Sequence, residues 1–301
     1  MTRLVLVHGI NQQGKSEELL RKDWVSHICR GLDKIDALAN LDIVVPFYGD
    51  ELKRLSDGGD VVAVSQGPDG KPDADEAAFL ASALIETATE AGIGSAAIAA
   101  EQRALVRESG DLAQEQGFIM NRRFNAIVRL LERVSPLHGK VVMRILKQAF
   151  AYLKKPGVGK AVDAIVRPAL EQGPSIIVSH SLGTVVTFKL LRQMALEGKP
   201  VKVPLYVTVG SPLPLMAVQA ALGPEFAKPP GVERWINASD PDDFITLGKG
   251  LDKSTFADGI ENLLDVENDR DDPHSISGYL ADKRIARGIA QACGINGRSP
   301  T

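Results

Sequence analysis

The sequence of 301 residues is 44% hydrophobic and 24% charged, close to the average for globular proteins and enough to bury a sizeable core in one large domain. Its formal net charge of −3 excludes a general electrostatic attraction to nucleic acid or to an anionic membrane. The two cysteines, Cys29 and Cys293, lack the paired spacing of a disulfide scaffold or a zinc cluster and indicate a reducing, cytoplasmic environment.

The chain begins with the apolar run RLVLVH, which passes straight into a glycine-containing loop. We therefore expect a first buried strand here and not a signal peptide. A helix is predicted over 16–32, because apolar residues recur there at helical spacing and Ser16 can cap its N-terminus. A second strand is predicted over 41–50.

The second half of the chain alternates again between strand and helix patterns. This alternation predicts an α/β fold with a mostly parallel central sheet flanked by helices. No transmembrane segment is expected, because the longest uncharged stretch, 203–224, contains four prolines. The predicted elements are strands over 174–181, 203–212 and 232–240, and helices over 182–198 and 282–293.

Residues 51–160 are rich in alanine and in helical patterns, and we predict a helical cap or lid inserted into a single domain that spans 1–301. Over 57–115 twelve acidic residues stand against three basic ones, whereas over 121–160 ten basic residues stand against one acidic residue. Two arrangements follow from this pattern. Either the two halves pack together and neutralise one another, or the basic amphipathic face of 121–160 contacts an anionic lipid surface or another acidic partner.

A candidate phosphate-binding loop follows the first strand. Gly9, Gly14, Lys15 and Ser16 match the pattern G-x-x-x-x-G-K-[ST], whose backbone N–H groups wrap nucleotide phosphates. A nucleotide-binding enzyme of this type also needs an apolar strand that ends in an aspartate for Mg²⁺. The most apolar later strand ends in Ser-His-Ser at 179–181 instead. The rest of the chain therefore favours another chemistry.

The stretch IIVSHSLGTVV places Ser181 between a buried strand and a helix. Ser179 lies two residues before it and Gly183 two residues after it, and small residues at these positions permit the strained turn that exposes a nucleophile. The N–H of Leu182, at the start of the helix, can then point at a developing oxyanion. The pattern predicts Ser181 as a nucleophile.

These motifs and their order resemble the α/β-hydrolase superfamily, in its lipase and esterase branch. The resemblance covers about residues 1–50 and 165–290, and the chain departs from the family pattern G-x-S-x-G by placing Ser179 at the first glycine. It implies an α/β-hydrolase fold with a mostly parallel sheet. It also implies that Gly9 lets the backbone approach the substrate and that the N–H of Ile10 joins that of Leu182 in an oxyanion hole.

The family carries its triad in the order serine, acid, histidine. His274 is the histidine that follows Ser181, and it lies in a polar loop before the final helix, where the family carries its general base. The acid is expected just after the strand over 232–240. Asp243 is preferred because two apolar residues follow it, and Asp240 is the alternative.

The resemblance implies a serine hydrolase that cleaves carboxylic esters through an acyl-enzyme, with no metal or organic cofactor. A small-molecule or lipid-like ester is the expected substrate, although the choice of a lipid rests on analogy and on the apolar faces of the lid. Two alternatives belong to other classes: a catalytically inactive hydrolase-fold binding module, and a nucleotide binder that uses Gly9–Ser16.

Overall fold

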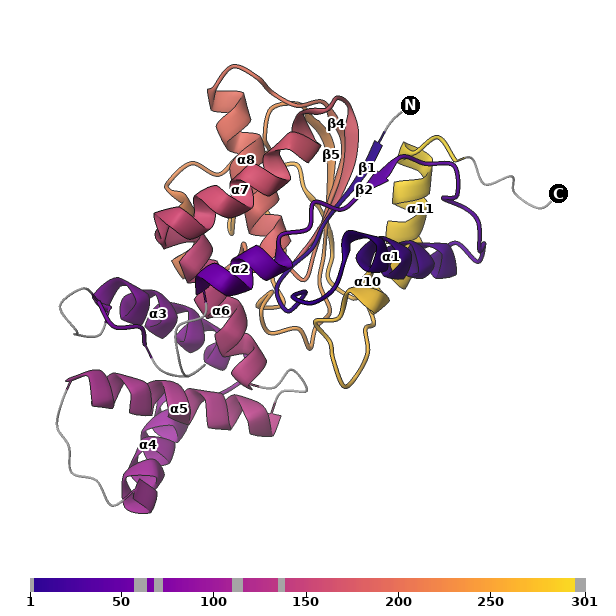
Figure 1. The fold of residues 1–301 in the computed structure, drawn as a ribbon. Helices are drawn as coiled ribbons and strands as arrows, with labels where there is room; N and C mark the ends of the chain where they lie inside the picture. Colours follow the sequence, from indigo (N-terminus) through magenta and orange to yellow (C-terminus); the bar gives the residue numbers. More distant parts are fainter. Residues whose placement is uncertain (1–2, 57–63, 68–72, 110–115, 135–138, 296–301) are drawn as a thin grey trace.

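The computed structural model describes residues 3–56, 64–67, 73–109, 116–134 and 139–295. Within these residues the chain forms a six-stranded sheet flanked by eleven helices (Figure 1). The predicted fold class, an α/β fold with a parallel central sheet between helices, is confirmed and is consistent with an α/β-hydrolase-like fold.

All neighbouring strands pair in parallel, in the order β2-β1-β3-β4-β5-β6. The inner strands are apolar and buried on both faces, as expected for a sheet covered on both sides. The register aligns Val7 with Ser179 and His180 with Val209, so the carboxyl ends of β1, β3 and β4 meet at one edge. The strands are β1 (Arg3–Val7), β2 (Ile43–Val44), β3 (Ser175–His180), β4 (Val203–Val209), β5 (Val232–Ala238) and β6 (Glu261–Leu263).

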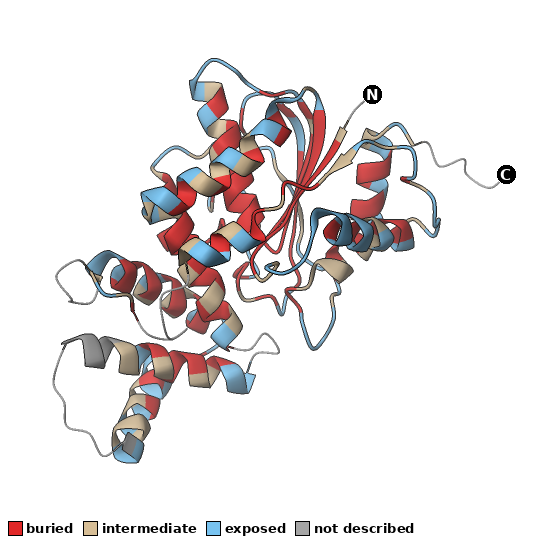
Figure 2. Ribbon diagram, viewed as in Figure 1, coloured by how far each residue is buried: buried red, intermediate tan, exposed pale blue. Residues whose placement is uncertain are grey.

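Two helical layers cover the sheet. Helices α1 (Glu17–Gly31), α10 (Ile276–Ala281) and α11 (Lys283–Ala292) contact one another on one face. Helices α7 (Pro156–Glu171) and α8 (Leu182–Leu196) lie on the other face (Figure 1). Figure 2 shows that the sides of these helices turned toward the sheet are buried, which gives the molecule an apolar core on each face of the sheet.

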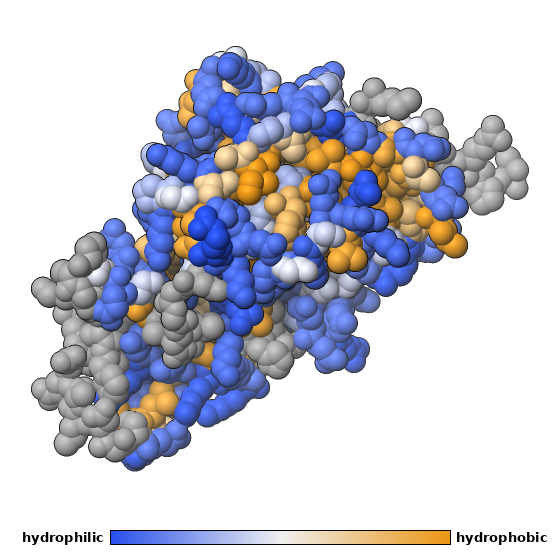
Figure 3. All heavy atoms as spheres, viewed as in Figure 1, coloured by the Kyte–Doolittle hydropathy of each residue, from blue (hydrophilic) through white to orange (hydrophobic). Residues whose placement is uncertain are grey.

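Between β2 and β3 the described chain is helical. Helices α3, α4 and α5 project away from the sheet, whereas α6 returns toward it (Figure 1). On the face drawn in Figure 3, hydrophilic side chains cover much of this projection, and apolar side chains gather near the edge strand β2. The bounds are α2 (Gly49–Ser56), α3 (Ala74–Glu90), α4 (Ser95–Ser109), α5 (Gln116–Val134) and α6 (Gly139–Lys154), with α9 (Met216–Leu222) after β4.

The acidic and basic halves of this helical region meet as ion pairs. Arg133 of α5 pairs with Glu101 of α4 at 2.9 Å. The carboxylate of Glu76 on α3, with 1% of the side chain exposed, lies 3.7 Å from the Lys147 ammonium and 3.8 Å from that of Lys155. These contacts correspond to the first of the two predicted arrangements, while the contact of 121–160 with a lipid surface stays a prediction. None of the described helices combines the length and apolar character that a membrane crossing requires.

The second strand is much shorter than the sequence predicts. The strand expected over 41–50 is limited to Ile43–Val44, because Pro46 has no N–H for the ladder and the chain then turns inward. There the backbone N–H of Tyr48 donates to Nε2 of His8 at 3.1 Å. The prediction also missed β6 and the short helices α9 and α10, whose few residues give no periodic signal.

Candidate active site

Ser181 alone forms the turn between β3, which ends at His180, and α8, which begins at Leu182. Its backbone angles are φ 52° and ψ −127°, a conformation that costs a non-glycine residue about 1–3 kcal/mol. The turn is held in place because the N–H of Ser181 donates to the carbonyl of Val209 at 3.1 Å. A strained strand-turn-helix of this kind raises the side chain above the edge of the sheet.

The residues around the turn are small because there is no room for larger ones. A Cβ added to Gly183 would lie 2.3 Å from the carbonyl oxygen of Val7, so α8 could not approach β1 with a larger residue there. Ser179, the small residue two positions before Ser181, is buried and donates its hydroxyl to the carbonyl of Val207 at 3.2 Å. The hydroxyl therefore has a hydrogen-bond partner within the turn region.

The structure brings Ser181, His274 and Asp243 together in one chain of hydrogen bonds. Nε2 of His274 lies 2.8 Å from Oγ of Ser181, and Nδ1 lies 2.8 Å from Oδ2 of Asp243. All three side chains are buried, with exposed fractions of 1% for Ser181, 7% for His274 and 0% for Asp243. In this arrangement Nδ1–H donates to the carboxylate, and Nε2 accepts the hydroxyl proton of the serine.

The environment of His274 favours its protonation. Burial of the ring lowers its pKa, but the charge of Asp243 and the hydrogen bond to it outweigh burial, and the charge of Asp272 adds to them, so that the pKa of His274 is raised. The imidazole can therefore take up a proton from Ser181 and hold it as an imidazolium beside a carboxylate. This is the requirement for a general base in acyl transfer.

The carboxylate of Asp240, the alternative acid, accepts hydrogen bonds from backbone N–H groups. Its Oδ1 accepts the N–H of Asp242 and its Oδ2 accepts the N–H of Asn268, each at 2.7 Å. The side-chain amide of Asn268 in turn donates to the carbonyls of Pro273 at 3.0 Å and Ser275 at 2.5 Å, on either side of the histidine. Asp240 thus anchors the loop that carries His274, and burial raises the pKa of its carboxyl group.

Two further side chains contact this group and were not predicted as site residues. The hydroxyl of Tyr279 donates to Oδ2 of Asp243 at 2.8 Å. Nε2–H of His180 donates to the backbone carbonyl of His274 at 2.8 Å, and burial holds the pKa of His180 well below its ordinary value, so the ring is neutral. No sequence pattern could have assigned these contacts, because they join segments that only the fold brings together.

The loop after β1 lies directly against the serine. A Cβ added to Gly9 would lie 2.6 Å from Cβ and 3.2 Å from Oγ of Ser181, so the backbone reaches the nucleophile only because residue 9 is glycine. The neighbouring Ile10 is buried, and its carbonyl accepts a hydrogen bond from the amide of Gln12 at 2.9 Å. Leu182, on the other side of the serine, is also buried. The two predicted oxyanion residues therefore flank Ser181.

The remainder of the candidate phosphate loop is engaged in contacts within the chain. The N–H of Gly14 donates to Oδ1 of Asp50 at 2.7 Å. Lys15 is exposed, and the hydroxyl of Ser16 accepts the N–H of Leu19 at 3.2 Å, which confirms Ser16 as the N-cap of α1. The carboxylate of Asp50 thus occupies an N–H group that a phosphate would need, and its charge would repel a phosphate.

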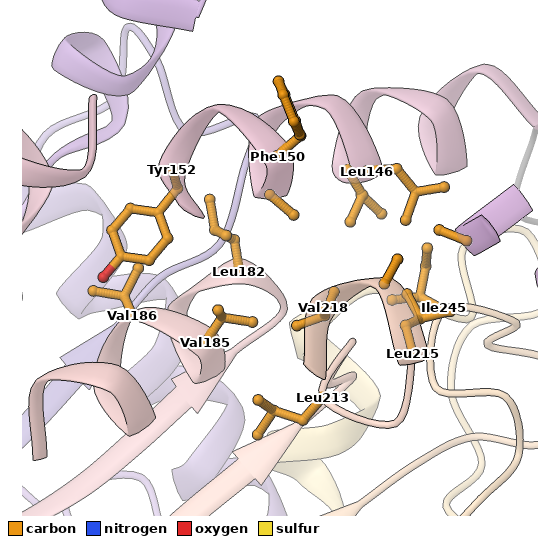
Figure 4. Close-up of a cluster of buried hydrophobic side chains, with 14 of the residues drawn as sticks. Leu146, Phe150, Tyr152, Leu182, Val185, Val186, Leu213, Leu215, Val218 and Ile245 are labelled. Carbon is orange, nitrogen blue, oxygen red and sulfur yellow. The ribbon is translucent and has the colours of Figure 1, made fainter. Parts of the chain in front are cut away.

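Helix α6 packs over the start of α8. Figure 4 shows α6, which carries Leu146, Phe150 and Tyr152, above Leu182, with Leu146 on the side of Leu215 and Ile245. Leu146, Leu182, Leu215 and Ile245 belong to one buried apolar cluster, and Ile245 follows Asp243 by two residues. The apolar cluster thus joins Leu146 of the helical region to residues that lie next to Ser181 and close to Asp243 in the sequence.

Among the described residues, no group of three or more His, Cys, Asp or Glu side chains is arranged to hold a metal ion. The chain matches no family model, no curated protein and no solved structure in the comparisons with known proteins.

Proposed function

We propose that this protein is a serine hydrolase of the α/β-hydrolase type that cleaves carboxylic esters. The observation that carries the proposal is the continuous hydrogen-bond chain from Ser181 through His274 to Asp243, on a strained turn at the carboxyl edge of a parallel sheet. A buried Ser-His-Asp chain with this geometry is the recurring arrangement of nucleophilic acyl transfer.

In the first step His274 takes the proton from Oγ of Ser181, and Oγ attacks the ester carbonyl carbon. Asp243 stabilises the imidazolium that forms, and the carbonyl oxygen becomes an oxyanion near the backbone N–H groups of Leu182 and Ile10. The tetrahedral intermediate then collapses. His274 gives its proton to the leaving alkoxide, the alcohol departs, and an acyl group remains on Ser181.

In the second step a water molecule replaces the alcohol. His274 removes a proton from the water, and the hydroxide attacks the acyl carbonyl with the same oxyanion donors in place. Collapse breaks the bond to Oγ of Ser181, which regains its proton from His274, and the carboxylic acid is released. The reaction consumes one water molecule for each ester and uses the side chains and backbone N–H groups of the site.

The surroundings of the triad favour an apolar acyl group. Leu146, Leu182 and Ile245 belong to the apolar cluster beside the serine, and transfer of an alkyl chain from water to such a surface contributes about 0.8 kcal/mol for each CH₂. Because Ser181 is only 1% exposed, an ester can reach it only after some of the residues above the turn have moved.

The nucleotide-binding alternative has less support. Asp50 holds the N–H of Gly14, and Ser16 caps α1 in place of holding a metal-bound phosphate. An inactive binding module would have no need of the strained turn at Ser181, which costs stability and places the hydroxyl against His274. Both observations favour the hydrolase.

Labelling with a fluorophosphonate probe tests the proposal, because the probe phosphonylates only an activated serine. We expect one adduct on Ser181, located by peptide mass spectrometry and absent from the Ser181→Ala variant. Thr184→Ser serves as a matched control, since it keeps a hydroxyl one turn away. A wild-type protein that is folded and remains unlabelled, with the probe given at rising concentration in a detergent that opens apolar lids, would contradict the proposal.

A further inference from the structure

We propose that Tyr279 is a positioning residue of this site, which fixes the carboxylate of Asp243 through its hydroxyl and so tunes how His274 binds its proton. The inference rests on the proposed function for its role in catalysis. The hydrogen bond between Tyr279 and Asp243 does not depend on the proposed function, so its effect on His274 can be tested separately.

The carboxylate oxygen that faces the histidine has two donors. Oδ2 of Asp243 lies 2.8 Å from Nδ1 of His274 and 2.8 Å from the hydroxyl of Tyr279. The tyrosine oxygen is itself oriented, because it accepts the backbone N–H of Asp240 at 3.0 Å. With one acceptor lone pair used by Asp240, the phenolic hydrogen is left to point at Asp243.

Burial makes this donor important. Asp243 and Tyr279 are both 0% exposed, so water cannot take the place of the hydroxyl. A buried carboxylate is costly unless donors surround it. In the described part of the chain, the other donors to Asp243 are Nδ1–H of His274 and the N–H of Ile245, which lies 3.3 Å from Oδ1. Tyr279 therefore makes a short hydrogen bond to Asp243, of 2.8 Å, from a group that is uncharged and takes no part in proton transfer.

The charged and titratable groups around the histidine are few. Asp243 and Asp272 act on His274 with negative charge, and the ring of His180, 4.8 Å away between centroids, is held neutral by burial. The backbone N–H of Asp240 donates to the hydroxyl oxygen of Tyr279, and the negative charge of Asp240 acts on Tyr279. A change at Tyr279 thus reaches His274 mainly through Asp243.

Loss of the Tyr279 hydroxyl is expected to raise the pKa of His274. In Tyr279→Phe the Asp243 carboxylate loses a donor, and this loss matters most while His274 is neutral, because an imidazolium would compensate the carboxylate charge. The protonated histidine becomes relatively more stable. We expect the titration midpoint of His274 to rise by about half to one pH unit in this variant.

The experiment is an NMR titration of the His274 ring carbons in the whole protein, with the rate of fluorophosphonate labelling followed over the same pH range. Tyr152→Phe is the matched control, because the Tyr152 hydroxyl also lies buried and donates to a carboxylate, that of Asp163, at 2.7 Å. We expect both the titration midpoint and the midpoint of the labelling profile to move upward in Tyr279→Phe and to stay in place in Tyr152→Phe. A residue that only stabilises the fold would lower the labelled fraction equally at every pH.

An unchanged His274 midpoint in folded Tyr279→Phe overturns the inference. Should that variant not fold, 3-fluorotyrosine introduced at position 279 keeps the contact with a stronger donor. The midpoint of His274 is then expected to fall, and an unchanged value overturns the inference. Failure of the proposed function has a different signature, since Ser181 of the wild type would stay unlabelled at every pH while His274 still titrates and still responds to Tyr279.

Discussion

Arg144 of α6 donates a hydrogen bond from Nη1 to Oδ1 of Asn11 at 3.2 Å, and so joins this helix to the loop after β1, which lies against Ser181. Asn11 directly follows Ile10 and has a positive φ of 59°. The conformation of Asn11 sets the path of the backbone beside the proposed oxyanion donor. The position of α6 is thus linked to the proposed oxyanion donor by this hydrogen bond, in addition to the apolar cluster that contains both Ile10 and residues of α6.

We expect Arg144→Met to weaken catalysis without unfolding the protein. The aliphatic part of the side chain is kept and the bond to Asn11 is lost, so the donor at Ile10 is held less firmly and kcat/KM for a short ester falls about tenfold. Lys154→Met, a change of an exposed basic residue on the same helix, is the control. Equal rates in the two variants would refute the link.

Substitution of Asp243 is expected to lower the catalytic rate far more than substitution of Asp240. Asp243→Asn keeps the shape of the side chain but removes the charge beside Nδ1 of His274, and kcat is expected to fall about 10⁴-fold. Asp240→Asn keeps an acceptor for the loop that carries His274, and a loss below about tenfold is expected. Steady-state kinetics of both variants measures the difference. The opposite ranking would make Asp240 the triad acid.

Activity is expected to rise with pH through the titration of His274. The base must be neutral to act, and Asp243 raises its pKa above the ordinary 6.5 against the effect of burial, so the labelling rate of Ser181 should reach half its maximum above pH 6.5. The same raised pKa stabilises the folded chain below about pH 6.5, and this contribution is lost as pH rises through the folded-state pKa. A midpoint below 6.5 in the wild type would contradict this expectation.

His8 is expected to make the fold sensitive to acid. Burial lowers its pKa to about 4, and both ring nitrogens are engaged, because Nδ1–H donates to the carbonyl of Gly9 and Nε2 accepts the N–H of Tyr48. His8 therefore binds a proton more readily in the unfolded chain than in the folded one. The free energy of unfolding is at its full value above pH 6.5 and falls by about 3 kcal/mol as the pH drops to 4.

Urea unfolding at pH 7 and pH 5 measures this effect. The difference in unfolding free energy between the two pH values should be smaller in His8→Gln than in the wild type. An equal pH dependence in His8→Gln and the wild type would contradict the role assigned to His8.

Local sequence was enough to predict the parts of the site that depend on local geometry. Ser181 lies on the strained turn, as expected from its small neighbours, and the preference for Asp243 rested on the apolar residues that follow it. Ile245 is indeed buried in the core, and its N–H donates to Asp243. Such short-range patterns reflect steric limits that act within a few residues.

Contacts between residues far apart in the sequence could not be predicted from local patterns. Tyr279, Asn268 and Arg144 reach the site from α10, from the loop after β6 and from α6, and nothing in their neighbouring residues distinguishes them from ordinary surface or core positions. The opposite charges of the helical region predicted ion pairs, but only the packing of α4 against α5 assigned Glu101 to Arg133. Which acidic residue pairs with which basic residue is therefore determined by the tertiary structure.

The position of β1 inside the sheet has a consequence for synthesis of the chain. β1 is synthesised before β3, with which it pairs through Leu4 opposite Ile176, and the helical region between β2 and β3 must be made before that partner exists. Until then the apolar stretch Leu4–Val7, fully buried in the finished molecule, has no β3 edge to bind. Pairing between segments far apart in sequence forms slowly, so β1 has only β2 as a strand partner until the helical region and β3 have been made, and an apolar strand with an unpaired edge is prone to aggregate.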